Sequence, residues 1–155
     1  MVRRRGLTTM GCGPPSQSST APLLSCELRI ANRIWEIERV ATLVASFGAR
    51  HNLPENVIFA LGVSLDEVLN NVISYGYDDA LEHEILVRLT LQGEEVEVIV
   101  EDHGKPFNPL SLPAPNLEAK DRIGGVGIQF VRRLTDEIQY ARRDGVNQLR
   151  LIKKI

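Results

Sequence analysis

Residues 53–76 read LPENVIFALGVSLDEVLNNVISYG, and the spacing of their apolar side chains predicts one long helix. At about 100° per residue, the large apolar side chains share one arc of this helix, which suits packing against a core. They are Leu61, Leu65, Val68, Leu69 and Val72. Pro54 is expected at the first helical position, where its missing N–H costs nothing, and Gly76 is expected to end the helix.

The opposite side of this helix carries a polar stripe made of Glu67, Asn70, Asn71 and Ser74. One interpretation is a solvated face, which is what most amphipathic helices present. Asn is a mediocre helix former, however, so two adjacent Asn beside a Glu indicate oxygens held at fixed positions. Carboxylate and amide oxygens suit Mg²⁺ and can orient a water or a hydroxyl group. The stripe is therefore a candidate site.

The preceding helix is expected to begin near Ile34, with Asn32 as its cap, and to fade around residues 48–52. Its apolar residues recur at helical spacing. Its two large aromatic residues, Trp35 and Phe47, fit either the core or an interface, and the core is the safer expectation.

Shorter patterns on both sides of these helices complete the predicted fold. Two strand pairs have hairpin signatures at their turns, Gln92-Gly93 and Asp144-Gly145. The expected strands span residues 24–30, 85–91, 96–101, 137–143 and 146–152, and a short helix is expected from Gly127 to Leu134. This order predicts an α/β two-layer sandwich with a mixed, mostly antiparallel sheet and the helices on one face. It does not match a doubly wound Rossmann fold.

Composition bounds the class of the protein. The 155 residues, 43% apolar and 25% charged, suit a domain with a hydrophobic core. Residues 1–22 are rich in Ser and Pro, so we expect a disordered tail before a folded domain of residues 23–155.

No apolar run approaches the roughly 20 residues that cross a bilayer. Cys12 in the tail and Cys26 in a strand do not suggest a structural disulfide, so we expect a cytoplasmic protein without a membrane partner.

The charge balance argues against a nucleic-acid partner. Without Arg3, Arg4 and Arg5 of the tail, 15 basic residues stand against 20 acidic ones. Phosphate contacts need clustered Lys and Arg, and the pairs 132–133 and 142–143 read as solvated surface instead.

Two further patterns follow the second hairpin strand, each explicable on its own as an ordinary turn or cap. Asp102, at the end of a strand, precedes Gly104, and a rigidly held carboxylate there can accept a hydrogen bond from an amino group. Residues 103–123 contain four Pro and no period, which is typical of a functional loop or lid. The run Gly124-Gly125-Val126-Gly127 then opens a helix, where backbone N–H groups favour an anion.

The polar stripe on the long helix, the Asp102-x-Gly104 turn and the glycine run follow one another in an order that resembles the GHKL ATPase superfamily. That superfamily has N, G1 and G2 boxes on the Bergerat fold. The resemblance is closer to the anti-sigma-factor serine kinases of bacterial partner-switching systems. It rests on residues 64–71 with the Tyr75-Gly76-Tyr77 stretch, on residues 101–109 and on residues 123–136, and covers about residues 24–155.

This resemblance implies a role for each matching residue. Glu67 would be the general base for the attacking hydroxyl or water, and Asn71 would hold Mg²⁺ at the ATP phosphates. Asp102 would read the adenine, and Gly104 would shape that part of the pocket.

The resemblance also implies a phosphate site. Gly124, Gly125, Val126 and Gly127 would cradle the phosphates together with the lid, and Arg122 would reach the γ-phosphate. Tyr75 stands where many relatives have His, which leaves the edge of the pocket open.

The implied reaction transfers the ATP γ-phosphate to a serine or threonine of a small anti-sigma-factor antagonist, a STAS-type protein. The implied partners also include a sigma factor and a second copy of the chain, since relatives commonly act as homodimers. Three alternative functions remain. The first is a histidine-kinase catalytic domain, for which His51 is a poor phosphoacceptor. The others are a binding module that holds ATP as a structural ligand and an α/β domain that binds no nucleotide.

Overall fold

The computed structural model describes residues 24–111 and 126–155. The expected tail of residues 1–22 lies outside them, so its boundary stays a prediction, as do the placements of Arg122, Gly124 and Gly125. The elements are β1 (Leu24–Ala31), a 3-10 turn η1 (Ile34–Glu36), α1 (Ile37–Arg50), α2 (Glu55–Tyr75), β2 (Glu84–Gln92), β3 (Glu95–Asp102), a second 3-10 turn η2 (Pro109–Ser111), α3 (Val126–Leu134), β4 (Glu137–Arg143) and β5 (Val146–Lys154).

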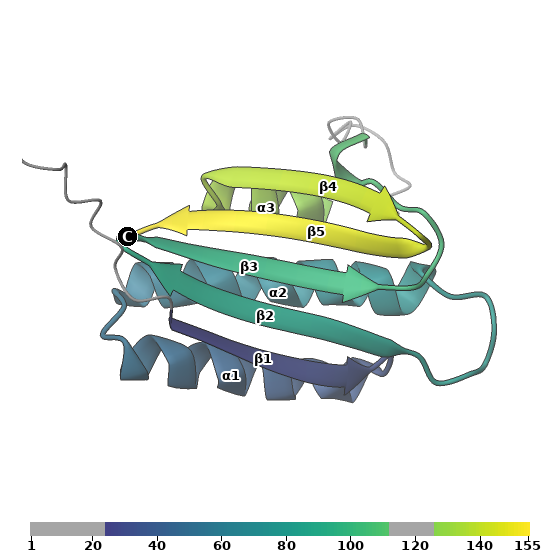
Figure 1. Cartoon of the computed structure of the whole chain (residues 1–155), viewed down its shortest axis with the longest axis horizontal. Helices are drawn as coiled ribbons and strands as arrows, with labels where there is room; N and C mark the ends of the chain where they lie inside the picture. Colours follow the sequence, from purple (N-terminus) through teal and green to yellow (C-terminus); the bar gives the residue numbers. More distant parts are fainter. Residues whose placement is uncertain (1–23, 112–125) are drawn as a thin grey trace, which may run out of the picture.

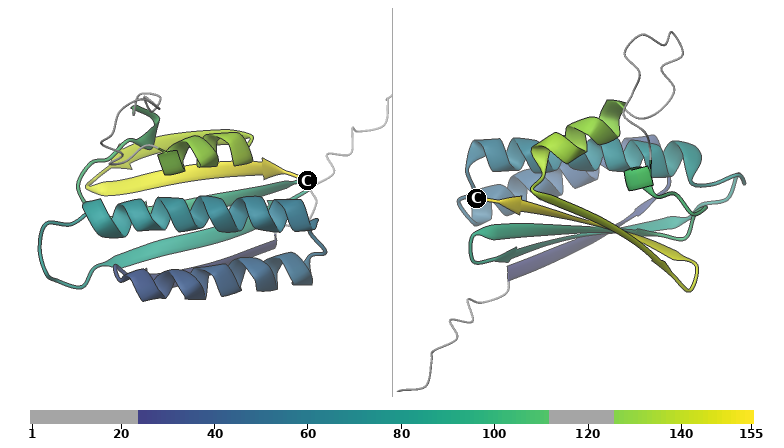
Figure 2. Two further views of the ribbon diagram at one scale, coloured as in Figure 1. Left: turned by 180° about the vertical axis from the view of Figure 1, so that it is seen from behind. Right: turned by 90° about the horizontal axis from the view of Figure 1, so that it is seen from above.

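The five strands form one sheet in the order β1-β2-β3-β5-β4, and α1, α2 and α3 cover one of its faces (Figures 1 and 2). The predicted two-layer α/β sandwich is confirmed. The expected mixed character is not found among the described strands, because all four pairings are antiparallel. β3 and β4 run in the same direction, but β5 lies between them, so no parallel pair forms.

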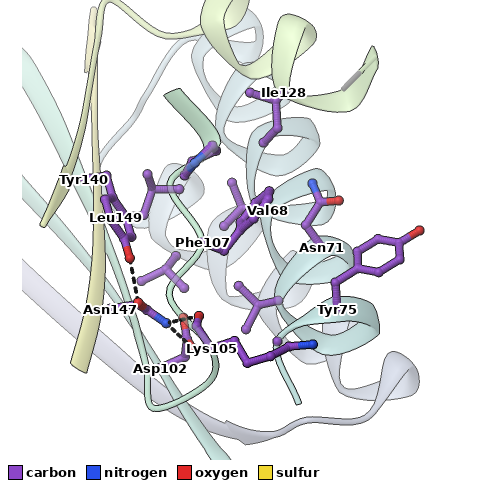
Figure 3. Close-up of a pocket in the computed structure, with 14 residues that line it drawn as sticks. Val68, Asn71, Tyr75, Asp102, Lys105, Phe107, Ile128, Tyr140, Asn147 and Leu149 are labelled. Atoms are coloured by element: carbon purple, nitrogen blue, oxygen red, sulfur yellow. Dashed lines mark hydrogen bonds between the residues drawn. The ribbon is translucent and has the colours of Figure 1, made fainter. Parts of the chain in front are cut away.

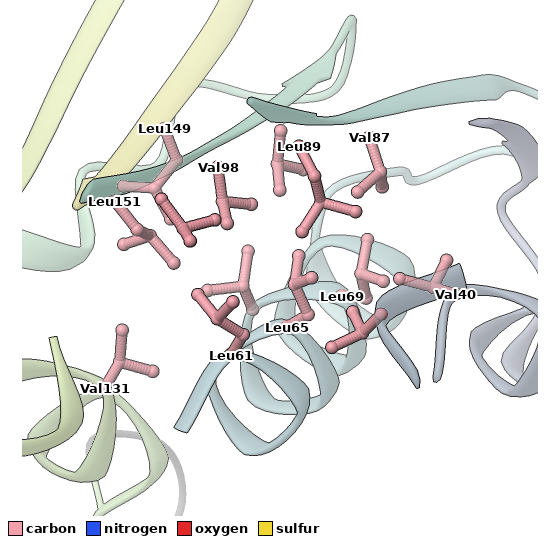
Figure 4. Packing of buried hydrophobic residues seen from close by; sticks show 14 of the residues in the cluster. Val40, Leu61, Leu65, Leu69, Val87, Leu89, Val98, Val131, Leu149 and Leu151 are labelled. Atoms are coloured by element: carbon pink, nitrogen blue, oxygen red, sulfur yellow. The ribbon is translucent and has the colours of Figure 1, made fainter. Parts of the chain in front are cut away.

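The core lies between the helices and the covered face of the sheet (Figure 4). Leu61, Leu65 and Leu69 of α2 are at most 2% exposed, which confirms the predicted apolar arc. They face alternate residues of the sheet, such as Val98 of β3 and Leu151 of β5. The uncovered face is polar and carries cross-strand ion pairs, as expected for an antiparallel sheet with one solvated side.

Several predicted boundaries are shifted by one residue. Pro54 is the N-cap of α2, not its first helical residue, and the first hairpin turns at Gly93-Glu94, where Gly93 has φ +60°. The second hairpin turns as predicted at Asp144 and Gly145, with φ values of 50° and 80°. Positive φ at both central residues matches the right-handed twist of the strands.

The prediction that Asn32 caps the first helix is wrong. Its side chain instead accepts a hydrogen bond from the His83 N–H at 2.9 Å and donates one to the Leu81 carbonyl. These bonds tie the end of β1 to the loop before β2. Arg33 is the N-cap of η1 and Glu36 is the N-cap of α1, and neither makes a capping bond with its side chain.

The prediction for the aromatic residues of the first helix is half right. Phe47 is 4% exposed and lies in the core, whereas Trp35 is 66% exposed. Trp35 falls in η1, before the amphipathic helix begins, and the Arg33 guanidinium lies 5.4 Å from its ring centre.

By length and composition, α2 could cross a membrane, and it is the one such helix in the described part of the chain. Its buried arc packs on the sheet in this structure. That packing is typical of a core helix.

Candidate functional site

A pocket opens between the C-terminal half of α2, the end of β3 and the start of α3 (Figure 3). Its walls are largely apolar, with Val68 and Val72 from α2, Leu149 from β5 and Phe107 from the loop after β3. A few polar side chains converge on these walls: Asn71, Asp102, Lys105 and Asn147. Apolar walls with a few placed polar groups are the usual form of a small-molecule site.

Asp102 is buried at the sheet side of this pocket, with 5% exposure. Strand alternation puts it there, because it follows Val96, Val98 and Val100 on the covered face. Its Oδ1 accepts hydrogen bonds from the Gly104 N–H at 2.8 Å and from Asn147 Nδ2 at 2.9 Å. Among the described residues, both hydrogen bonds to the carboxylate go to Oδ1, so Oδ2 has capacity for a ligand.

Gly104 brings the turn after β3 against the end of α2. A Cβ atom at this position would lie 2.6 Å from the Gly76 carbonyl oxygen and 2.9 Å from Asp102 Oδ1. The Gly76 carbonyl oxygen accepts a hydrogen bond from the Lys105 N–H at 2.7 Å, and Lys105 Nζ pairs with the Asp78 carboxylate at 2.7 Å. Only glycine permits this approach, so Gly104 shapes the pocket by fixing the turn to the helix.

The predicted polar stripe of α2 divides between three environments. Asn71 lines the pocket. Glu67, one turn earlier, contacts Gly127 at the start of α3 and lies just outside the pocket lining. Asn70 donates to the Asp66 carbonyl at 2.9 Å, and Ser74 is exposed, so neither belongs to the site.

Of the predicted glycine run, residues 124–127, the structure describes only Val126 and Gly127. Val126 is 43% exposed, and Gly127 is at the first turn of α3. Arg122, Gly124 and Gly125 lie outside the described residues.

Asn147 is a site residue that the sequence reasoning missed. It pairs with Asp102 across β3 and β5 and is 5% exposed. Its Nδ2 also donates to the Lys105 carbonyl at 2.9 Å, while Tyr140 donates to its Oδ1 at 2.7 Å. A signal existed, because Asn147 shares the inward phase of its strand with Leu149 and Leu151.

Tyr77 and Arg132 lie close to the pocket without lining it. Burial, followed by the nearby Asp102 carboxylate, raises the pKa of Tyr77 to about 12, so its hydroxyl stays neutral. Arg132 was expected on the solvated surface, and this is wrong: it is half-buried and donates to the Leu110 carbonyl at 2.7 Å. This bond ties α3 to η2, where Pro109 lines the pocket.

Comparison with known proteins assigns this arrangement to a family. The histidine kinase-like ATPase domain family matches residues 30–153, which span all three helices and reach from β1 to β5. The chain belongs to this family. The match includes the Glu67–Asn71 face of α2 and the Asp102 turn, and the predicted resemblance to GHKL ATPases is confirmed.

Individual relatives of this histidine kinase-like ATPase domain include a protein kinase. The serine/threonine-protein kinase BtrW of Bordetella bronchiseptica is 32% identical over 98 residues, or 60% of this chain and 68% of that protein. The chain is therefore similar to a serine/threonine-protein kinase over about two thirds of that protein.

Two solved structures share the fold. The structure of the RsbU and RsbW domains of Rv1364c from Mycobacterium tuberculosis matches with a TM-score of 0.63 at 17% identity, over 86% of this chain and 33% of that one. A blue-light activated histidine kinase domain from Erythrobacter litoralis EL346 matches with a TM-score of 0.52 at 19% identity, over 78% and 60% of the two chains. This domain therefore spans only part of either solved chain.

Proposed function

We propose that this ATPase domain is a protein serine/threonine kinase that acts as a partner-switching regulator. The observation that carries the proposal is one pocket flanked by two carboxylates: Asp102 buried at its sheet side, and Glu67 against the first turn of α3. The relation to BtrW, a serine/threonine-protein kinase, supports the same class of activity.

Asp102 is proposed to bind the adenine base of ATP. Its Oδ1 is held by the Gly104 N–H and Asn147, so Oδ2 can accept a hydrogen bond from the 6-amino group. The purine ring would pack on the apolar walls formed by Val72 and Leu149. Gly104, by keeping the turn close to α2, sets the depth of this part of the pocket.

Asn71 is proposed to hold the Mg²⁺ ion of Mg²⁺-ATP. In residues 24–111 and 126–155, no group of three or more His, Cys, Asp or Glu side chains is arranged to hold a metal ion. A nucleotide-bound Mg²⁺ does not require one, because phosphates and waters supply most of its six oxygens. The Asn71 amide oxygen at the pocket wall fits this need, and the ion would neutralise charge on the phosphates.

The start of α3 is proposed to cradle the phosphates. Val126 and Gly127 lie at the N-terminus of this nine-residue helix, where free N–H groups and the helix dipole favour anions. Gly124 and Gly125 would extend this surface along the backbone, and Arg122 would contact the γ-phosphate.

Glu67 is proposed as the general base. As the serine hydroxyl oxygen of the partner forms a bond to the γ-phosphorus, the bond from that phosphorus to the ADP oxygen breaks, and Glu67 accepts the hydroxyl proton. Such transfer depends mainly on positioning and charge stabilisation. The contact with Gly127 supports this role, because it sets the carboxylate beside the proposed phosphate site.

The proposed acceptor is a small anti-sigma-factor antagonist of the STAS type, and a sigma factor is a second proposed partner. We also propose a homodimer in the cytoplasm, with neither nucleic acid nor membrane as a partner. A histidine-kinase activity is not favoured, because His51 at the end of α1 packs edge-on against Phe47, with ring centres 4.6 Å apart.

Thermal unfolding with Mg²⁺-ATP tests the nucleotide site. A ligand at about 100 times its Kd stabilises by about 2.7 kcal/mol, so Mg²⁺-ATP should raise Tm measurably. Asp102→Asn should remove most of the rise, and no rise in the wild type would refute the site. A pull-down with γ-labelled ATP then identifies the acceptor. Binding without transfer to any captured partner would favour a nucleotide-gated binding module.

A further inference from the structure

Asn147 links three parts of the pocket that are far apart in the sequence. Its Nδ2 donates to Asp102 Oδ1 at 2.9 Å, to the Gly104 carbonyl at 3.3 Å and to the Lys105 carbonyl at 2.9 Å. Its Oδ1 accepts from the Tyr140 hydroxyl at 2.7 Å and from Arg142 Nη1 at 2.6 Å. The side chain thus joins the turn after β3 to the outer hairpin of β4 and β5.

The chemistry of these neighbours fixes which way the amide points. A carboxylate and two carbonyl oxygens can only accept, so they require the NH₂ end of Asn147. Arg142 can only donate, so it requires the carbonyl end. With both ends committed, Asn147 cannot turn to serve a ligand, and it acts on the pocket through Asp102 and through the turn of Gly104 and Lys105.

The geometry points to Asn147 as the positioning residue that sets base specificity. By holding Asp102 Oδ1 together with the Gly104 N–H, it keeps the carboxylate from rotating and leaves Oδ2 in one direction. A fixed acceptor in a buried site selects a purine with an amino group at carbon 6 over one without it. This inference rests on the proposed function, in which Asp102 binds the purine base.

Few other side chains can make this set of contacts. Aspartate has the same shape but, when ionised, has no donor, and it would put a second carboxylate beside Asp102. Alanine would remove the donor that Asp102 Oδ1, the Gly104 carbonyl and the Lys105 carbonyl share. The first two keep one other donor each, the Gly104 N–H and Arg142 Nη1, so the Asp102 carboxylate would be held by a single hydrogen bond from the described residues. The matched control is Gln148, the next residue of β5, which bonds to Glu101 Oε1 at 2.7 Å on the opposite face of the sheet.

The test compares the affinity of the full chain for Mg²⁺-ATP with that for purine riboside triphosphate, which lacks only the 6-amino group. The wild type should prefer ATP by about tenfold, the value of one hydrogen bond to a charged group. In Asn147→Ala this ratio should fall towards one, whereas Gln148→Ala should keep it. A purely structural role would weaken both nucleotides equally, so an unchanged ratio in Asn147→Ala would overturn the inference.

A second variant covers the case in which Asn147→Ala does not fold. Tyr140→Phe with Arg142→Ala keeps Asn147 and its three acceptors but removes both donors to its Oδ1, so that one end of the amide is no longer held. It also removes the Arg142 hydrogen bond to the Gly104 carbonyl at 3.0 Å. Arg142 is exposed, and Tyr140→Phe removes only the hydroxyl. The ATP preference should fall several-fold here too, and a full preference would count against the inference. Failure of the proposed function has a different signature, because neither the wild type nor any variant would then bind ATP.

Discussion

Gly127 at the start of α3 lies directly against the carboxylate of Glu67 on α2. A Cβ atom at residue 127 would overlap Glu67 Oε2 and come within 2.7 Å of its Cδ. The two residues are sixty positions apart in the chain and meet where α2 and α3 pack. The glycine therefore has a role beyond capping the helix, because its missing side chain is what gives the proposed general base its place.

Gly127→Ala should disturb the position of Glu67. The added methyl group forces the flexible end of the Glu67 side chain, or α3, to move, so the carboxylate loses its place beside the proposed phosphate site. We expect a lower Tm and a loss of phosphotransfer that exceeds any loss of ATP affinity, measured by labelled-phosphate transfer and by calorimetry.

Gly62→Ala is the matched control for that variant. A Cβ atom at this α2 position meets nothing within 4 Å. Replacing a glycine inside a helix with alanine should then stabilise the protein by about 0.5–1 kcal/mol and leave transfer unchanged. If Gly127→Ala changed Tm and phosphotransfer in the same way as Gly62→Ala, the contact between Gly127 and Glu67 would not contribute to phosphotransfer.

Glu67→Gln separates catalysis from binding. The amide keeps the size of the side chain but cannot take the hydroxyl proton, so transfer should fall by about 100-fold or more while the Tm rise with Mg²⁺-ATP remains. Asp66→Asn changes a neighbouring exposed acid and should leave both readouts intact. Normal transfer by Glu67→Gln would rule out the general-base role.

Much of the site could be predicted because its signals are local. Helical periodicity alone puts Glu67 and Asn71 on one face of α2, and strand alternation continues from Val100 to Asp102 on the covered face. The hairpin at Asp144-Gly145 is equally local, since positive φ at both residues is a property of that dipeptide.

The parts that could not be predicted depend on which strands pair. Asn147 reaches Asp102 only because β5 pairs with β3, and nothing within either strand specifies that pairing. The contact of Arg132 could not be predicted for a similar reason, because the Leu110 carbonyl that accepts its hydrogen bond belongs to a different element. The prediction that Trp35 is buried is wrong for a local reason, because Trp35 lies in a 3-10 turn and not in the amphipathic helix.

Tyr77 offers a pH-dependent test of the surroundings of Asp102. Its pKa is raised from 10.0 to about 12, first by burial and then by the Asp102 carboxylate. A raised pKa means that the folded state holds this proton more tightly than the unfolded state does, so the stabilisation is complete below pH 10 and is lost towards pH 12.

Ultraviolet titration of the tyrosines should therefore show one late-ionising group that is absent in Tyr77→Phe. In Asp102→Asn that group should still titrate late, though earlier than in the wild type, because burial is the larger cause. If the late group is unaffected by Tyr77→Phe, another tyrosine is responsible and the two side chains are not coupled.

Arg132→Ala should loosen the wall of the pocket formed by η2. The guanidinium donates to the Leu110 carbonyl at 2.7 Å and more weakly to that of Pro109 at 3.4 Å, and Pro109 lines the pocket. Loss of a half-buried charged donor should cost about 1–2 kcal/mol of stability and weaken Mg²⁺-ATP several-fold. Arg133→Ala is the control, because this adjacent arginine is exposed. Equal Tm values and equal ATP affinities for the two variants would mean that the bonds from α3 to η2 do not support the pocket.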